Sequence, residues 1–150
     1  MKIIVTLIIA LCLVACGKVD YQEVPGVDKE VNEVGKIIAK FQRSEVWTGG
    51  NEYSGCYTWE HREKFLKNKG LERIAAKAKG NRDFMRGIVA LKRIPTDKQN
   101  EILKIWGKPI DPTWRQTGRI GDGTTEAGWE TERDIAETLT KLAKNLLSLQ

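Results

Sequence analysis

The sequence is poor in the residues that build metal sites and disulfide frameworks, with 3 cysteines and 1 histidine among 150 residues. Two of the cysteines, Cys12 and Cys16, fall at the apolar N-terminal end, so Cys56 is the only thiol expected in the remaining chain. One histidine and one such thiol do not provide the ligand spacing of a zinc site, and a lone cysteine cannot close an internal disulfide. We therefore expect no metal, no other cofactor and no internal disulfide. Cys56 is then either an inert, partly buried thiol or a residue that pairs with another chain.

Apolar runs long enough to cross a bilayer are also missing. The longest extends from Ile3 to Ala15, with Lys2 before it and no acidic residue inside it. A transmembrane helix needs about 20 apolar residues, so this run is too short for a comfortable span. A positive start, an apolar centre and a small-residue end are typical of a secretory signal. We predict that residues 1–15 are a signal peptide.

The end of that run carries a specific motif, Leu13-Val14-Ala15-Cys16 followed by Gly17. It resembles the lipobox of bacterial lipoproteins, and the resemblance covers this segment only. It implies that Cys16 becomes an acylated N-terminus, which would anchor the protein to a membrane without a spanning helix. In enterobacterial members of this class an Asp at the next position favours the inner membrane. Because Gly17 stands there, we expect a place in the cell envelope, at the outer membrane facing the periplasm.

The remaining chain is long enough for one domain with its own core, since removing 15 of 150 residues leaves 135. Residues 16–27 show no periodicity and include Val24-Pro25-Gly26, a cluster that interrupts regular structure. We therefore assign residues 16–27 to the lipidated N-terminus and a linker, and residues 28–150 to a single domain.

Apolar residues recur at helical spacing at the start of this domain and through its middle. The first series predicts a helix over 28–43, with Asp28 as its cap. Helical composition resumes at Thr58, and Gly70 and Gly80 punctuate it where a helix C-terminus would use a positive φ. The first series consists of Val27, Val31, Val34, Ile38 and Phe41.

Two further helices and two loops complete the predicted fold. Thr96 to Gln99 has the pattern of a capping box and predicts a helix over 97–106. The last helix is indicated by apolar residues that step by 4, 3, 4 and 3, namely Ile135, Leu139, Leu142, Leu146 and Leu149. Residues 44–57 and 107–128 are rich in glycine and contain tryptophans, so we predict loops there. The expected fold is mainly α, a small domain of about four to five helices with two long loops on a short tether.

Positive charge is concentrated in the middle of the chain. Residues 61–108 hold 14 Lys or Arg against 5 Asp or Glu, whereas residues 17–60 hold 5 against 8 and residues 109–150 hold 5 against 7. A basic region on a tethered protein favours an anionic surface or an acidic envelope protein. Solvated helix faces are the alternative explanation. Secretion argues against nucleic acid, which we do not expect as a partner.

The tryptophans lie in or beside the predicted loops, where indole rings can form a binding surface or fill the core. Together with the basic region they give the predicted binding residues, which are Trp47, Trp114, Trp129, Arg82, Arg86, Lys92 and Arg93.

We therefore expect a non-enzymatic envelope lipoprotein, a tethered binding or assembly-accessory module of the accessory, exclusion or immunity type. The alternative is a small periplasmic cell-wall hydrolase that uses His61 with Glu60, Glu63 or Cys56, because an imidazole beside a thiol or carboxyl can activate a nucleophile. Known thiol hydrolases generally recruit their histidine from far along the chain, which favours the binding module.

Overall fold

The structure is a computed structural model, and it describes residues 21–47, 58–108 and 124–149. Within these ranges the chain forms six helices and no strand. The helices are α2 (Lys29–Trp47), α3 (Trp59–Lys67), α4 (Gly70–Lys79), α5 (Arg82–Leu91), α6 (Thr96–Trp106) and α7 (Thr124–Ser148). The predicted mainly α fold class is confirmed. The middle of the chain divides at Gly70 and Gly80, as the sequence indicated, and the six helices slightly exceed the expected four to five.

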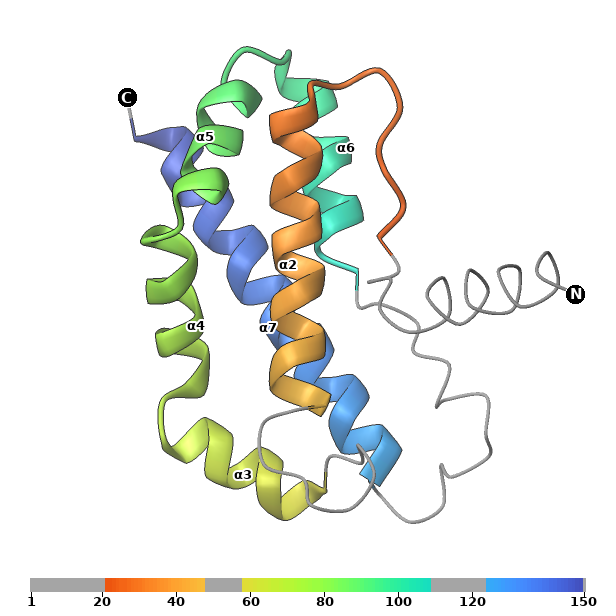
Figure 1. Cartoon of the computed structure of the whole chain (residues 1–150), viewed down its shortest axis with the longest axis vertical. Helices are drawn as coiled ribbons and strands as arrows, with labels where there is room; N and C mark the ends of the chain where they lie inside the picture. Colours follow the sequence, from red (N-terminus) through yellow and green to blue (C-terminus); the bar gives the residue numbers. More distant parts are fainter. Residues whose placement is uncertain (1–20, 48–57, 109–123, 150) are drawn as a thin grey trace, which may run out of the picture.

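The six helices pack as a bundle around α7, which is the longest with 25 residues. In Figure 1, α2 and α7 cross at the centre, α4 and α5 follow one another along one side, α6 lies on the other, and α3 lies across one end. Helix α7 contacts each of the other five described helices, and α2 packs most extensively against α5. The core therefore lies between α2, α5 and α7.

The helical spacing read from the sequence identifies the buried faces correctly. Val31, Val34 and Ile38 of α2 are buried, as are Ile135 and Leu139 of α7. Hydrophobic burial of one stripe along each helix holds the bundle together. Leu146 still packs against the core, whereas Leu149, the last residue of the predicted stripe, lies just beyond the end of α7 and is 68% exposed.

Two helices extend into regions where the sequence predicted loops. Helix α2 continues to Trp47 instead of ending near residue 43, and α7 begins at Thr124 rather than after Gly128. Ala127 and Gly128 are buried in the first turns of α7, so packing outweighs the low helix propensity of glycine there. The other parts of the two predicted loops, 48–57 and 109–123, lie outside the described residues.

The glycines at the ends of the short helices act differently from the prediction. Lys69, not Gly70, has the positive φ, of 58°. Gly70 begins α4, where a Cβ atom would collide with the ring of Phe65. Gly80 ends α4 with a φ of −81°, which any residue can adopt. The prediction of positive φ at these two glycines was wrong, because Gly70 serves close packing instead.

The capping box predicted for α6 is also absent. Pro95 occupies the N-cap position and provides no side-chain cap, and Thr96 is already the first helical residue. The Gln99 side chain donates from Nε2 to the carbonyl oxygen of Leu91, at 2.9 Å. Gln99 therefore provides a hydrogen-bond donor for a carbonyl at the end of α5, and does not cap the start of α6.

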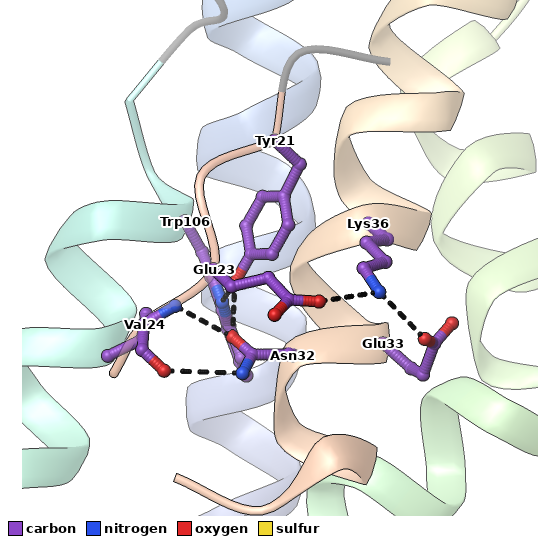
Figure 2. A network of polar contacts seen from close by, with 7 residues as sticks. All are labelled: Tyr21, Glu23, Val24, Asn32, Glu33, Lys36 and Trp106. Atoms are coloured by element: carbon purple, nitrogen blue, oxygen red, sulfur yellow. Dashed lines mark hydrogen bonds and ion pairs between the residues drawn. The ribbon is translucent and has the colours of Figure 1, made fainter. Parts of the chain in front are cut away.

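The described part of the predicted linker, residues 21–27, packs on the helices, and we call it the strap. Val24 is buried, and its backbone N–H donates to Oδ1 of Asn32 at 2.8 Å, while Nδ2 of Asn32 donates to the Val24 carbonyl at 3.2 Å. Tyr21 packs over Gly35, at which a Cβ atom would collide with the phenol ring. Figure 2 shows this strap lying across α2.

The strap also joins α2 to α6. The hydroxyl of Tyr21 donates to Oδ1 of Asn32 at 3.1 Å and accepts from Nε1 of the buried Trp106 at 3.3 Å. Burial raises the pKa of Tyr21, because the charged phenolate would lose its hydration. Lys36 bonds to Glu23 of the strap at 2.8 Å, and this bond lowers the pKa of Glu23 (Figure 2). The strap is thus an ordered part of the domain.

Candidate binding groove on helices α2 and α5

Three of the predicted binding residues lie along one side of α5 and the turn that follows it. Arg82 and Arg86 belong to α5, whereas Arg93 lies in the turn two residues after the last helical residue, Leu91. Because an α-helix repeats every 3.6 residues, Arg82, Arg86 and Val89 leave α5 in nearly the same direction, and Arg93 lines the same groove as they do. Val89 is 51% exposed. The face therefore presents an apolar centre between cationic ends.

This face forms one wall of a groove of about 630 Å³ between α5 and α2. We call it the α2–α5 groove. The opposite wall carries Glu30 and Glu33 of α2, and Asp83, Met85 and Ala90 of α5 complete the lining. The two helices that carry the walls approach closely at Gly87, where a Cβ atom would collide with Val34.

The two walls of the α2–α5 groove carry opposite charge. Arg82, Arg86 and Arg93 form no ion pair with any residue in the described ranges, so their guanidinium groups can bind an incoming carboxylate. On the other wall Glu33 accepts from Lys36 at 3.1 Å, and Glu30 is exposed. A uniformly anionic polymer or lipid surface would be repelled by this second wall. The charge pattern instead fits a protein segment that has charges of both signs and an apolar residue opposite Val89.

Lys92, the fourth predicted basic residue, does not reach this groove. Its Nζ donates to the backbone carbonyl of Leu149 at 3.2 Å, which directs it to the C-terminal end of α7. The sequence named Lys92 with the three arginines because all four belong to the basic middle of the chain, but Lys92 is the C-cap of α5 and its side chain bonds elsewhere.

Two of the predicted tryptophan residues, Trp47 and Trp129, belong to parts of helices that lie away from the arginine face. Trp47 ends α2, and Trp129 is in the first turns of α7, half-buried beneath the guanidinium of Arg133 at 5.6 Å. Trp129 is thus a helical residue, not one at a loop edge. In Figure 1 the end of α2 and the start of α7 lie at the α3 end of the bundle, opposite the top of α5. Trp114 lies outside the described residues.

The residues of the hydrolase alternative are arranged around a helix start. Thr58 caps α3, accepting from the backbone N–H of His61 at 3.2 Å, and its Oγ1 lies 2.8 Å from Nδ1 of the same histidine. Glu60 and Glu63 are exposed, and Cys56 lies outside the described residues. Among residues 21–47, 58–108 and 124–149 no group of three or more acidic, His or Cys side chains is placed to hold a metal ion.

The region of highest positive charge contributes a partly buried ion-pair cluster that the sequence did not reveal. Arg62 of α3 bonds to Asp134 of α7, and its Nε lies 3.6 Å from Glu130. Glu132, on the same helix, is fully buried. The distance of about 70 residues between the partners explains why spacing alone gives no sign of this cluster.

A second groove, of about 830 Å³, runs along α7 between α6 and α4, and we call it the α6–α7 groove. It carries Lys104, Lys141 and Lys144 against a single acidic residue, Glu137. Nothing in the sequence spacing shows that α6 lies beside Lys141 and Lys144 of α7. Asn100, Leu103, Gly107, Thr138, Thr140, Leu142, Asn145 and Ala75 complete the lining.

Comparison of this chain with protein-family models, with curated proteins and with solved structures gives no match. None of the helices in the described part of the chain is both long and apolar enough to cross a bilayer. The function therefore has to be argued from the two grooves and from the N-terminal motif.

Proposed function

We propose that this chain is a lipid-anchored lipoprotein of the bacterial cell envelope, and that its helical domain binds a partner protein through the α2–α5 groove. The observation that carries the binding part is the pairing of an arginine wall with an acidic wall around exposed Val89. Exposed apolar residues framed by charge are typical of protein contacts. The anchoring part depends on the lipobox, with Cys16 as the lipid-bearing residue and the outer membrane as the proposed location.

The walls of the groove explain why a protein is favoured over an anionic surface. Arginine binds carboxylates through two parallel hydrogen bonds and tolerates partial burial. Glu30 and Glu33 would select a basic residue on the partner, and thereby fix its register. The groove therefore requires an acidic residue for its arginines, a basic residue for Glu30 and Glu33, and an apolar residue for Val89. A partner helix or loop with one apolar residue between acidic and basic ones provides all three.

The binding proposal is tested in cells that make the full chain with a photo-crosslinking amino acid in place of Val89. We expect one discrete adduct. Arg86→Glu should reduce it at least about tenfold, since charge reversal opposes a complementary contact. The matched control is Lys79→Glu, which makes the same charge change at an exposed position of α4. The decisive result is recovery of the adduct when an acidic residue of the identified partner is changed to Lys in the Arg86→Glu background.

Two outcomes would overturn the binding proposal. One is the same set of adducts from a crosslinker at Val89 and from one at Lys79, which would mean that α5 has no specific partner. The other is equal loss of crosslinking in Arg86→Glu and Lys79→Glu.

Anchoring has a separate test. Mass spectrometry of the mature protein should find fatty acid on an N-terminal Cys16, and Cys16→Ser should accumulate as uncleaved precursor. Native protein that retains Met1 and carries no fatty acid would refute the anchored form.

The hydrolase alternative stays a prediction, and no observation in the described residues favours it. His61 is engaged with the hydroxyl of Thr58, and no groove described here is lined by it.

A further inference from the structure

The ordered strap limits how far the domain can stand from its lipid anchor. If the whole linker were free, residues 16–27 could extend about 40 Å at 3.3 to 3.6 Å per residue. The strap, however, is fixed on α2 and α6 from Tyr21 onward. From Cys16 to Tyr21 the chain can span at most about 18 Å. The part of the domain around Tyr21 is therefore kept close to the membrane, provided that the proposed anchoring holds.

The α6–α7 groove lies beside the site where the strap docks. Tyr21 is hydrogen-bonded to Trp106, and the next residue, Gly107, lines the groove. A Cβ atom on Gly107 would lie 3.6 Å from Oγ1 of Thr140, a lining residue of α7. The strap and the groove thus share the C-terminal end of α6. Lys108, which follows Gly107, is exposed and adds a further positive charge there.

The charge of this groove differs from that of the α2–α5 groove. Lys104, Lys141 and Lys144 face one acidic residue, Glu137, and no acidic wall opposes them. All three lysines are exposed and form no ion pair in the described part of the chain. Lysine ammonium groups on flexible stems bind phosphate as point charges and need no fixed geometry. Clusters of lysine beside an anchor are attracted to anionic headgroups.

We propose that the α6–α7 groove faces the bilayer and binds the headgroup phosphates of anionic phospholipids, an inference that rests on the proposed anchoring at Cys16. The anchor, the strap and the lysines then orient the domain. In this orientation the α2–α5 groove, which shares no lining residue with the α6–α7 groove, is left accessible to a partner; α5 lies on the other side of α2 from the strap (Figure 1).

The test measures orientation on vesicles with the full, acylated chain. A fluorescent probe is attached to Asn100→Cys in the α6–α7 groove, in a Cys56→Ser background, and a lipid with a spin-labelled headgroup quenches it. We expect strong quenching on vesicles of phosphatidylcholine mixed with phosphatidylglycerol, and weaker quenching on phosphatidylcholine alone. Probes at Val89→Cys on α5 and Lys79→Cys on α4 should be quenched little on either.

Charge variants separate this groove from general basicity. The triple variant Lys104→Glu, Lys141→Glu and Lys144→Glu should reduce quenching at Asn100→Cys on the anionic vesicles to the level seen on phosphatidylcholine. A control with the same charge change, Lys64→Glu, Lys67→Glu and Lys79→Glu on α3 and α4, should retain it. Circular dichroism checks that both variants keep their helix content.

The proposal is overturned if the three probes are quenched equally, if the α4 probe is quenched most, or if both triple variants lose quenching alike. The mass of the same preparation shows whether Cys16 is acylated. A failure of the proposed orientation can therefore be distinguished from a failure of the proposed anchoring. An acylated chain with an unquenched groove refutes the orientation alone, whereas an unacylated mature chain refutes the anchoring.

Discussion

Asn32 is the residue that turns an irregular N-terminal segment into part of the domain. Its amide both accepts from and donates to the backbone of Val24, in the same way as a neighbouring strand would, and it also accepts from Tyr21. Asn32 itself is buried, so each of these groups would be left without water if the amide were removed. The apolar pattern of α2 gave no sign of this role, because a polar residue on a helix is ordinarily read as an exposed one.

We predict that Asn32→Ala lowers the free energy of unfolding by about 3 kcal/mol, since buried backbone groups of Val24 lose their partners. Urea denaturation measures the loss, and hydrogen exchange should show faster exchange of the Val24 amide. Gln22→Ala, an exposed change in the same strap, should alter the free energy by less than about 0.5 kcal/mol. Equal effects of the two substitutions would show that the strap is not held by Asn32.

The raised pKa of Tyr21 predicts that the strap weakens in alkali. An unfolded chain ionises tyrosine near pH 10, whereas the buried hydroxyl keeps its proton to higher pH. Between these two pKa values the folded state binds more protons than the unfolded state. The contribution of the Tyr21 hydroxyl to the free energy of unfolding is therefore fully present below about pH 10, and it is lost as the pH rises through the raised pKa. Thermal unfolding of the native chain and of Tyr21→Phe across this window gives the measurement. The difference between their unfolding temperatures should shrink as the pH rises. A difference that stays constant with pH would contradict the prediction.

At the scale of the elements, the closest contact in the bundle depends on a missing side chain. Gly87 of α5 packs against Val34 and the backbone of Glu30, so the two helices can approach until their backbones nearly touch. This approach brings together the two helices that carry the charged walls of the α2–α5 groove. Gly87 therefore links the stability of the bundle to the spacing of those walls.

We predict that Gly87→Ala lowers the free energy of unfolding by about 2 kcal/mol, because the added methyl group forces α2 and α5 apart. Gly80→Ala is the matched control. At Gly80 the φ is already that of a right-handed helix and the nearest atom to a Cβ would be 3.5 Å away, so stability should rise slightly, by up to about 1 kcal/mol. Chemical denaturation of both variants decides the matter, and a neutral Gly87→Ala would show that the helices can separate without cost.

The helices themselves could be predicted from the sequence, but several of their ends could not. Periodicity located the buried faces of α2 and α7 because one stripe of each helix meets the core. The rules for helix caps failed near Lys69 and at Gln99. There Gly70 packs against Phe65, and Gln99 bonds to the carbonyl of Leu91. Such contacts depend on how the helices are arranged in three dimensions, which the local sequence pattern does not specify.

At the scale of the whole molecule, the charge excess read from the sequence does not form one patch. Part of it enters an ion-pair cluster at Arg62, part lines the α2–α5 groove, and Lys104 joins α7 lysines in the α6–α7 groove. The arginines of the candidate site could be named in advance because they belong to the basic middle of the chain. Glu30, Glu33 and the α7 lysines could not, since they come from helices distant in the chain.

Helix α7 follows the other described helices in the chain and yet contacts all of them. As the chain is synthesised, the apolar stripes of α2 to α6 therefore appear before the surface that covers them, and the bundle can close only once residues 124–148 have been made. If the export proposed above takes place, this order would keep the chain open until its C-terminal helix has been synthesised.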